Sequence, residues 1–368
     1  MHQKNNFFIK AVCILASIAV VFVLPLYSIV LWISKLLKRE IVWKLNDETG
    51  PVKRYLVRNW LGNDATAQHH RVFIYFLFPS FSAFFVFVTF PFLHGLVLSM
   101  TNWTGLNTGN EAFVGFQNYV SIFSDARFAY SFYRTILYSL MNIFAINLVA
   151  FFLAMLVTQN LRFKNIYRAG FFMPNLIGGL VLGYIWQFIF NRALVNVSEI
   201  FSPSLLVNGE TALLGLIIVV TWQFAGYIMM IYVAALQNIP QDLIEASKID
   251  GANAWQRLKT VTFPLVAQAF TVSMFLTLVT SFKQFDTVMS LTQGGPSAIM
   301  TSWIGNFYGL DILPVVQSTN LIAINIFQEA FSRNQMGVGQ AKAIVFFIFL
   351  LVISLLQVYY NKRREVEL

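Results

Sequence analysis

Cysteine and charged residues are both scarce in this chain of 368 residues. Its single cysteine, Cys13, lies in an apolar run, so a disulfide framework and a thiolate metal site are excluded. Only 11% of the residues are charged, whereas a soluble domain carries about 25%. Hydrophobic residues make up 57% and the mean hydropathy is +0.65, which excludes an ordinary soluble protein and indicates a protein of the lipid bilayer.

Motifs for metal binding, nucleotide hydrolysis and catalysis are also missing. The four histidines, His2, His69, His70 and His94, show no metal-ligand spacing. The sequence contains no G-x-x-x-x-G-K-[ST] phosphate loop, so we expect no ATP hydrolysis by the chain itself. Its acidic residues are scattered through loops. We therefore predict no catalytic residues, no metal and no cofactor in this chain.

The main feature of the sequence is a series of long apolar runs. Seven of them approach or exceed the roughly 17–25 residues that a transmembrane helix needs. Backbone polar groups in lipid must be satisfied within the segment, so each run is predicted to be a helix. The fold class is therefore an all-α integral membrane protein with about seven spans, near residues 12–34, 72–98, 134–157, 170–190, 212–236, 266–291 and 341–360.

Basic residues indicate which side of the membrane each loop occupies. The formal net charge is +9, but most Lys and Arg lie in short segments between spans, where they determine topology and do not indicate a nucleic-acid partner. The positive-inside rule predicts four cytoplasmic segments, 35–71, 158–169, 245–264 and 361–368. The opposite side then holds the N-terminus and three loops, 99–133, 191–211 and 292–340.

The predicted domains follow from these spans. Lys4 and Lys10 resemble the start of a signal peptide, but the apolar run is too long and no small-residue cleavage site follows it. We expect an uncleaved span, with a kink or a re-entrant segment at Pro25 as the alternative. The domains are an N-terminal transmembrane helix (1–34), a cytoplasmic linker (35–71), a membrane core (72–360) and a tail (361–368).

The most informative segment is a polar, glycine-centred loop over residues 240–264, between two apolar spans. Pro240 fits the first turn of a short helix, and Asp242 and Glu245 lie near its positive N-terminal end. Gly251 suits a left-handed turn, and Asp250 is predicted to cap a second helix over 252–262.

Two further features complete the loop. Ala246 and Ser247 keep one helix face thin, so another surface could approach closely. Pro264 is expected to break the second helix before the next span. An ordinary amphipathic loop on the membrane surface is the alternative interpretation, but the number of specified positions favours docking of a partner.

The loop is similar to the "EAA" coupling loop in permease subunits of binding-protein-dependent carbohydrate ABC importers of the maltose and multiple-sugar type. The matching residues are Glu245, Ala246, Ser247, Asp250, Gly251, Ala252, Trp255, Arg257 and Pro264. Four more segments fit the family in order and spacing across residues 72–360: FVGFQNY at 113–119, FFMP at 171–174, QNIP at 237–240 and GGP at 294–296.

This resemblance implies a type I core of six helices, preceded here by one extra helix, in a bacterial or archaeal plasma membrane with a cytoplasmic C-terminus. It also implies a second permease subunit, usually different from the first, two ATPases that bind ATP and Mg at the cytoplasmic face, and an extracytoplasmic solute-binding protein. Glu245 and Gly251 would carry the coupling, and the substrate would be a carbohydrate, specifically an oligosaccharide. The N-terminal addition and the long segment 297–340 depart from the usual pattern, and their roles stay open.

Polar residues in two spans are candidates for the substrate pathway. Gln223 and Tyr227 are four residues apart before the loop, and Thr277, Ser281 and Gln284 share a helix face after it. In the resembled family, sugar contacts come from these two helices. Hydrogen bonding between neighbouring helices is the competing interpretation.

Other interpretations of the chain stay open. The nearest is an ABC permease for a non-sugar solute such as a glycerol phosphate, for which Lys283 could recognise the anion unless it pairs with Asp286. A membrane enzyme acting on lipid-linked glycans would need a carboxylate pair or a histidine cluster that the sequence does not offer. In a non-transporting sensor, the loop would report occupancy.

Overall fold

The computed structural model describes residues 65–106, 111–159, 161–197 and 202–362. The predicted span at 12–34, residues 35–64 of the predicted linker, and most of the predicted tail lie outside the described residues. By its contacts the chain divides into two units, residues 1–95 and 96–368.

The described part of the first unit is helical. It contains α3 (Ala65–Phe84), the π-helical turn η2 (Phe85–Thr89) and the start of α4 (Phe90–Leu98), which together supply the candidate span Phe76–Leu98. Pro91 has no N–H for the carbonyl four residues earlier, which lies inside this widened turn. The span agrees with the apolar run predicted at 72–98.

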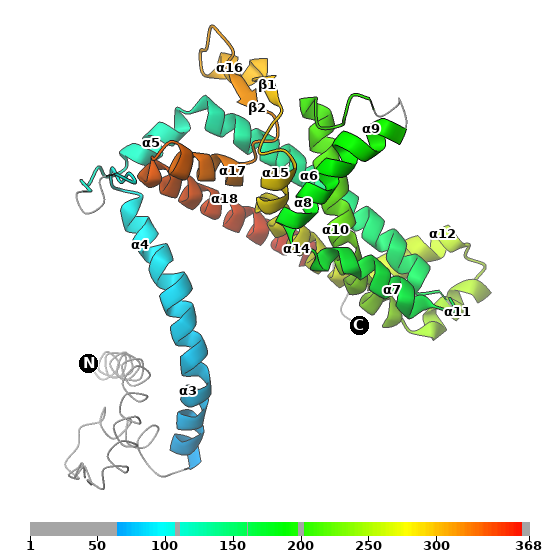
Figure 1. Cartoon of the computed structure of the whole chain (residues 1–368). Coiled ribbons are helices and arrows are strands. Elements are labelled where there is room, and N and C mark those ends of the chain that lie inside the picture. Colours follow the sequence, from blue (N-terminus) through cyan, green and yellow to red (C-terminus); the bar gives the residue numbers. More distant parts are fainter. Residues whose placement is uncertain (1–64, 107–110, 160, 198–201, 363–368) are drawn as a thin grey trace, which may run out of the picture. The chain divides into compact units, whose positions relative to one another are not determined.

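The second unit consists of helices around α6 and α10, with a small two-stranded sheet (Figure 1). Its elements are α5 (Gln117–Phe123), α6 (Ala126–Val157), α7 (Lys164–Phe172), η3 (Met173–Leu176), α8 (Gly179–Phe188), η4 (Ile189–Ala193), α9 (Leu194–Val197), α10 (Gly209–Gln237), α11 (Gln241–Ile249), α12 (Ala254–Arg257), η6 (Leu258–Thr262), α13 (Phe263–Leu265), α14 (Ala267–Phe282), α15 (Asp286–Leu291), β1 (Ser297–Ile299), α16 (Ser302–Phe307), β2 (Val315–Gln317), α17 (Ile322–Phe327), η7 (Gln328–Ser332) and α18 (Met336–Lys362).

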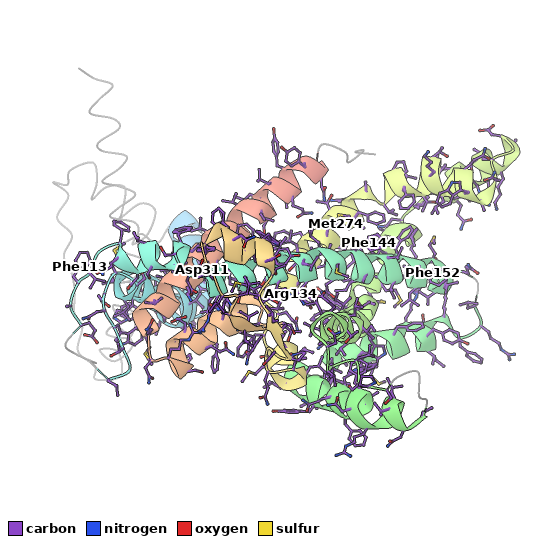
Figure 2. The ribbon with its side chains drawn as sticks, turned by 90° about the horizontal axis from the view of Figure 1, so that it is seen from above. Phe113, Arg134, Phe144, Phe152, Met274 and Asp311 are labelled. Carbon is purple, nitrogen blue, oxygen red and sulfur yellow. The ribbon has the colours of Figure 1, made fainter. Side chains whose placement is uncertain are left out.

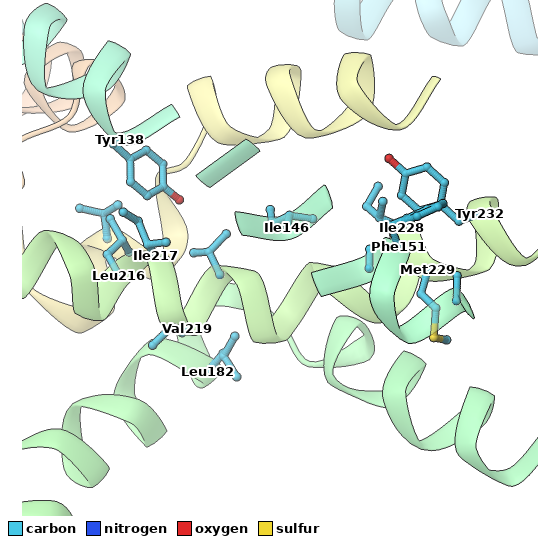
Figure 3. Close-up of a cluster of buried hydrophobic side chains, with 14 of the residues drawn as sticks. Tyr138, Ile146, Phe151, Leu182, Leu216, Ile217, Val219, Ile228, Met229 and Tyr232 are labelled. Atoms are coloured by element: carbon cyan, nitrogen blue, oxygen red, sulfur yellow. The ribbon is translucent and has the colours of Figure 1, made fainter. Parts of the chain in front are cut away.

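The core of this unit lies between α6 and α10. Side-chain caps start both helices: Asp125 accepts the Arg127 N–H at 2.9 Å, and Asn208 accepts the Glu210 N–H at 3.2 Å. Apolar side chains of α6 and α10 interlock along their length, with Leu182 of α8 against them (Figure 3). By contrast, Phe144 and Phe152 lie on an exposed face of α6 (Figure 2), as expected for contact with lipid or another subunit.

The spans are close to the prediction, with two corrections. The described residues contain five helices long and apolar enough to cross a membrane, or six if one bent pair counts as a span. The span expected at 170–190 instead runs over Gly179–Val197. Residues 173–178 interrupt it because Pro174 occupies a 3-10 turn and the extended Gly178 starts a new helix.

The second correction concerns the run at 266–291, which is not one helix. The segment Ala254–Leu265 joins α14 with a bend of 70°. Non-helical residues 283–285 then separate α14 from α15. These breaks place Lys283, Gln284 and Phe285 in a connection between helices, where their side chains line a cavity.

A closed chain of hydrogen bonds joins α6, α10 and α14 within their apolar surroundings. Ser273 donates to the Tyr232 hydroxyl (2.5 Å), Tyr232 donates to the Asn147 carboxamide oxygen (2.6 Å), and Asn147 donates to the Thr277 hydroxyl (3.0 Å). Thr277 donates back to the Ser273 carbonyl at 2.8 Å. Water is scarce in a bilayer, so partners of this kind are what make buried polar groups tolerable there.

The long segment after the GGP motif is structured. β1 and β2 pair antiparallel, with Ser297 opposite Gln317, and α16 lies between them in sequence. The apolar part near 319–327 forms α17, which packs against α6 and α18. The buried Arg134 of α6 holds this segment by donating to the Ser318 carbonyl at 2.8 Å. The same guanidinium pairs with Glu210 of α10 at 2.7 Å.

The contact of α10 with α7 generates a stability prediction. A methyl group at Gly226 would overlap the Phe171 carbonyl, which is backbone and cannot rotate away. We expect Gly226→Ala to lower the free energy of unfolding by about 1–3 kcal/mol, measured as a lower melting temperature of the purified protein. Gly170→Ala in α7, where a methyl group meets nothing within 4 Å, is the matched control and should melt at or slightly above the wild-type temperature. Equal melting temperatures of the two variants would contradict the packing.

Candidate functional site

The loop between α10 and α14 projects from one end of the second unit, away from β1 and β2 (Figure 1). It begins with α11, which follows Pro240. Asp242 lies in the first turn of α11 and Lys248 in its last turn, so both charges complement the helix dipole. Local sequence alone therefore accounts for this helix.

Gly251 forms the turn that ends α11. Its φ of +78° is the left-handed conformation expected from the sequence. Two hydrogen bonds close the turn, from the Gly251 N–H to the Lys248 carbonyl (3.1 Å) and from the Ala252 N–H to the Ser247 carbonyl (3.0 Å). This is a Schellman motif, which satisfies carbonyls at the helix end and fixes the exit direction of the chain.

The cap of the second helix differs from the prediction. Asn253, not Asp250, caps α12: its side chain accepts the Gln256 N–H at 2.9 Å, and the Gln256 side chain accepts the Asn253 N–H at 2.8 Å. Asp250 ends α11 instead. The sequence signal was the Asn-x-x-Gln spacing of a capping box. Arg257 strengthens the turn by donating to the Ala252 carbonyl at 2.7 Å.

The second helix is also shorter than the expected 252–262. It is regular only over Ala254–Arg257 and widens to a π-helix over Leu258–Thr262. Pro264 lies in the short α13, and the chain bends at Val266, two residues later. Because Pro264 has no N–H for a carbonyl in this widened stretch, it weakens the helix just before the bend.

The surface of the loop suits contact with a protein. Glu245, Ala246, Asp250 and Gly251 are exposed, and Ser247, Ala252 and Pro264 are half-buried. Apolar side chains are exposed beside these polar groups, with Ile249 at 86% and Trp255 at 68%. The exposed aliphatic and indole side chains leave this small polar loop open to contact with a partner protein or with the membrane surface.

Two of the predicted substrate residues line one cavity of about 200 Å³, which we call the glutamine pocket. Gln223 and Gln284 contribute to it together with Gly179, Phe224, Lys283, Phe285, Asp286 and Thr287. Gln223 donates to the Ile177 carbonyl at 3.1 Å, which leaves its carboxamide oxygen buried without a partner among the described residues. The Thr287 hydroxyl is in the same state. Unpaired buried groups of this kind favour a polar ligand.

The other three predicted residues lie outside the lining of this pocket. Thr277 and Ser281 are buried and face α6, where they accept hydrogen bonds from Asn147 (3.0 Å) and Asn142 (2.8 Å). Tyr227 packs half-buried against the apolar core. Thr277 and Ser281 therefore hydrogen-bond a neighbouring helix, as the alternative to a substrate role predicted. Their contact with substrate stays a prediction.

The two charged residues of the glutamine pocket are not paired in the way that their spacing suggested. Lys283 and Asp286 are both exposed at its rim, and within the described part of the chain they make no ion pair with each other. The spacing had suggested such a pair, but the helix ends at Phe282, so helical spacing does not apply across 283–285. No group of three or more His, Cys, Asp or Glu side chains that could hold a metal occurs in the described residues.

Comparison with known proteins identifies relatives that cover most of this chain. Residues 146–366 match the model of the family described as binding-protein-dependent transport system inner membrane component. A probable starch degradation products transport system permease protein of Thermoanaerobacterium thermosulfurigenes is 43% identical over 297 residues, covering 80% of this chain and 94% of that protein. A multiple sugar-binding transport system permease protein of Streptococcus mutans is 29% identical and covers 76% of this chain and 92% of its own length.

A solved structure has the same fold. A chain of a bacterial ABC transporter involved in import of the acidic polysaccharide alginate superposes with a TM-score of 0.65, covering 85% of this chain and 99% of that chain. Its sequence identity is 18%, so the likeness concerns the fold alone.

The turn at Gly251 generates a second prediction. Gly251→Ala forces an L-residue into the left-handed region at a cost of about 1–2 kcal/mol, so we expect faster amide hydrogen exchange in the last turn of α11. Gly178→Ala is the control, because Gly178 has an ordinary φ of −60° and a methyl group there meets nothing within 4 Å. Unchanged exchange in Gly251→Ala would show that the turn does not depend on glycine.

Proposed function

This chain belongs to the binding-protein-dependent transport system inner membrane components, and from that membership we propose that it is the permease subunit of an ATP-driven importer for an oligosaccharide. The chain is a multi-pass membrane protein of a transport family. The proposal adds the energy source, the direction and the substrate class.

The exposed loop between α10 and α14 is the observation that carries this proposal. It has a fixed turn, an exposed carboxylate at Glu245 and exposed apolar side chains at Ile249 and Trp255, which suits a cleft on a soluble partner. The sequence has no phosphate loop, so the partner must hydrolyse the nucleotide. We assign that role to a pair of ATPase subunits that bind ATP and Mg, and no catalytic role to this chain.

The remaining partners follow from the same assignment. The loop and the C-terminus face the cytoplasm, as the basic segments favour, and the segment with β1 and β2 faces outward, where a solute-binding protein delivers the substrate. The exposed face of α6 with Phe144 and Phe152 suits a second permease subunit.

The glutamine pocket supports a sugar as the substrate. Carboxamides of Gln223 and Gln284 match sugar hydroxyls, and the aromatic rings of Phe224 and Phe285 offer faces for pyranose C–H groups. A phosphorylated or acidic solute is the second candidate, because the Lys283 ammonium lines the same pocket. Asp286 beside it offsets that charge, so a neutral sugar is the better match.

Reversing the charge of the loop tests the coupling role. We expect Glu245→Lys to insert and melt like the wild type, because the side chain is exposed, but to lose co-purification with the ATPase and substrate uptake. Asp311→Lys makes the same charge change at an exposed residue between α16 and β2, far from the loop, and should keep co-purification with the ATPase. If Glu245→Lys imports substrate at the native rate, the coupling assignment is wrong.

Removing a carboxamide tests the pathway. Gln284→Leu keeps the approximate size of the side chain but cannot hydrogen-bond a sugar hydroxyl, so we expect KM for maltotriose uptake by the complete transporter to rise about 3- to 10-fold. Gln268→Leu, at an exposed position of α14, is the control and should leave KM unchanged. An unchanged KM in Gln284→Leu would remove this pocket from the substrate pathway.

A further inference from the structure

A second cavity lies beside β2, and we call it the hairpin pocket. Its volume is about 330 Å³, within the roughly 300–1,000 Å³ of small-molecule sites. The start of α6 forms one side, and the chain from β2 through η7 forms the other. Its lining consists of Arg127, Tyr130, Ser131, Val315, Val316, Gln317, Asn320, Asn325, Gln328, Ser332 and Arg333. It shares no residue with the glutamine pocket.

Most charged side chains around the hairpin pocket pair with one another in a partly buried network, and one arginine does not. Lys342, which is 1% exposed, contacts Asp125 at 2.8 Å and Glu329 at 2.7 Å, and Arg333 contacts Glu329 at 2.7 Å. Burial alone would raise the pKa of Asp125, but the hydrogen bond and charge of Lys342 and the N–H groups of Arg127 and Phe128 lower it below its usual value. Two cations and two carboxylates therefore cancel.

Arg127 is the residue left over. Its guanidinium makes no ion pair within the described part of the chain, and no acidic residue lines the pocket. The pocket thus carries about one unit of positive charge, from a side chain whose planar fork matches a carboxylate.

Carboxamides supply the polar wall of the pocket. Asn320 donates to the Gln328 oxygen at 2.9 Å, and Gln328 donates to the Gln317 oxygen at 3.0 Å. This relay fixes the three groups and uses the acceptors of Gln317 and Gln328. The Gln317 amino group and the second N–H of Asn320 and of Gln328 stay available to a ligand. So does the buried Asn320 oxygen, which accepts no hydrogen bond from the described residues.

We infer that the hairpin pocket binds one acidic sugar unit, with the carboxylate on Arg127 and sugar hydroxyls on Gln317 and Asn320. The lining offers the N–H groups of Arg127, Arg333 and Gln317 and no carboxylate, which suits a ligand rich in oxygen acceptors. The Asn320 oxygen needs a donor, which a hydroxyl supplies and an inorganic oxyanion does not. The sugar class rests on the proposed function, whereas the anion preference stands on this geometry.

The test measures binding of glucuronate, glucose and sulfate to the full-length protein in nanodiscs by calorimetry. Glucuronate should bind. Glucose should bind at least about tenfold more weakly, because it lacks the carboxylate that pairs with Arg127. Arg127→Gln should lower glucuronate affinity about 10- to 100-fold, with Arg127→Lys between the two. Arg127 is exposed, so these variants should fold. Arg162→Gln, at an exposed arginine of the loop before α7, is the control and should bind like the wild type.

Three results would overturn the inference: no binding of glucuronate, equal binding of glucose and glucuronate, or equal competition by sulfate. Glucuronate affinity that falls in Gln284→Leu and persists in Arg127→Gln would move the acid to the glutamine pocket and also overturn it. Glucuronate binding that depends on Arg127 would support the inference even if the complete transporter failed to import maltotriose. That failure would count against the proposed function alone.

Discussion

The closed hydrogen bonds among Ser273, Tyr232, Asn147 and Thr277 hold the membrane part of the second unit together. They join α6, α10 and α14, and the exposed loop connects the last two of these helices. In a bilayer the separated polar groups would find no water, so opening this arrangement is costly. A displacement of the loop would act on helices that are hydrogen-bonded to one another, as the proposed coupling to an ATPase needs.

Local features of the sequence predicted local features of the structure well. The lengths of the apolar runs predicted the spans near 72–98, 134–157, 212–236 and 341–360. Gly251 predicted the left-handed turn because few residues other than glycine adopt it. The prediction of Asp250 as the cap was wrong, because it overlooked the capping-box spacing of Asn253 and Gln256. The break at 173–178 was missed because hydropathy averages over Pro174 and Gly178.

Contacts between distant segments could not be predicted in the same way. Helical spacing correctly placed Thr277 and Ser281 on one face, but spacing does not say that this face meets α6. Gln223 and Gln284 share a pocket only because α14 ends at Phe282 and the chain turns. The pairing of Lys342 with Asp125 joins residues 217 positions apart, and no local pattern connects them.

The absence of a side chain at Gly226 limits how α10 can move. The Phe171 backbone occupies the space that any larger residue on that face would need. If α10 turned about its own axis, a bulkier neighbour would reach this position and push α7 away. If α10 instead slides or tilts together with α7, Gly226 stays against the Phe171 carbonyl. The basic residues Lys164 and Arg168 of α7 must then move with α10, although they lie more than fifty positions before Gly226 in the chain.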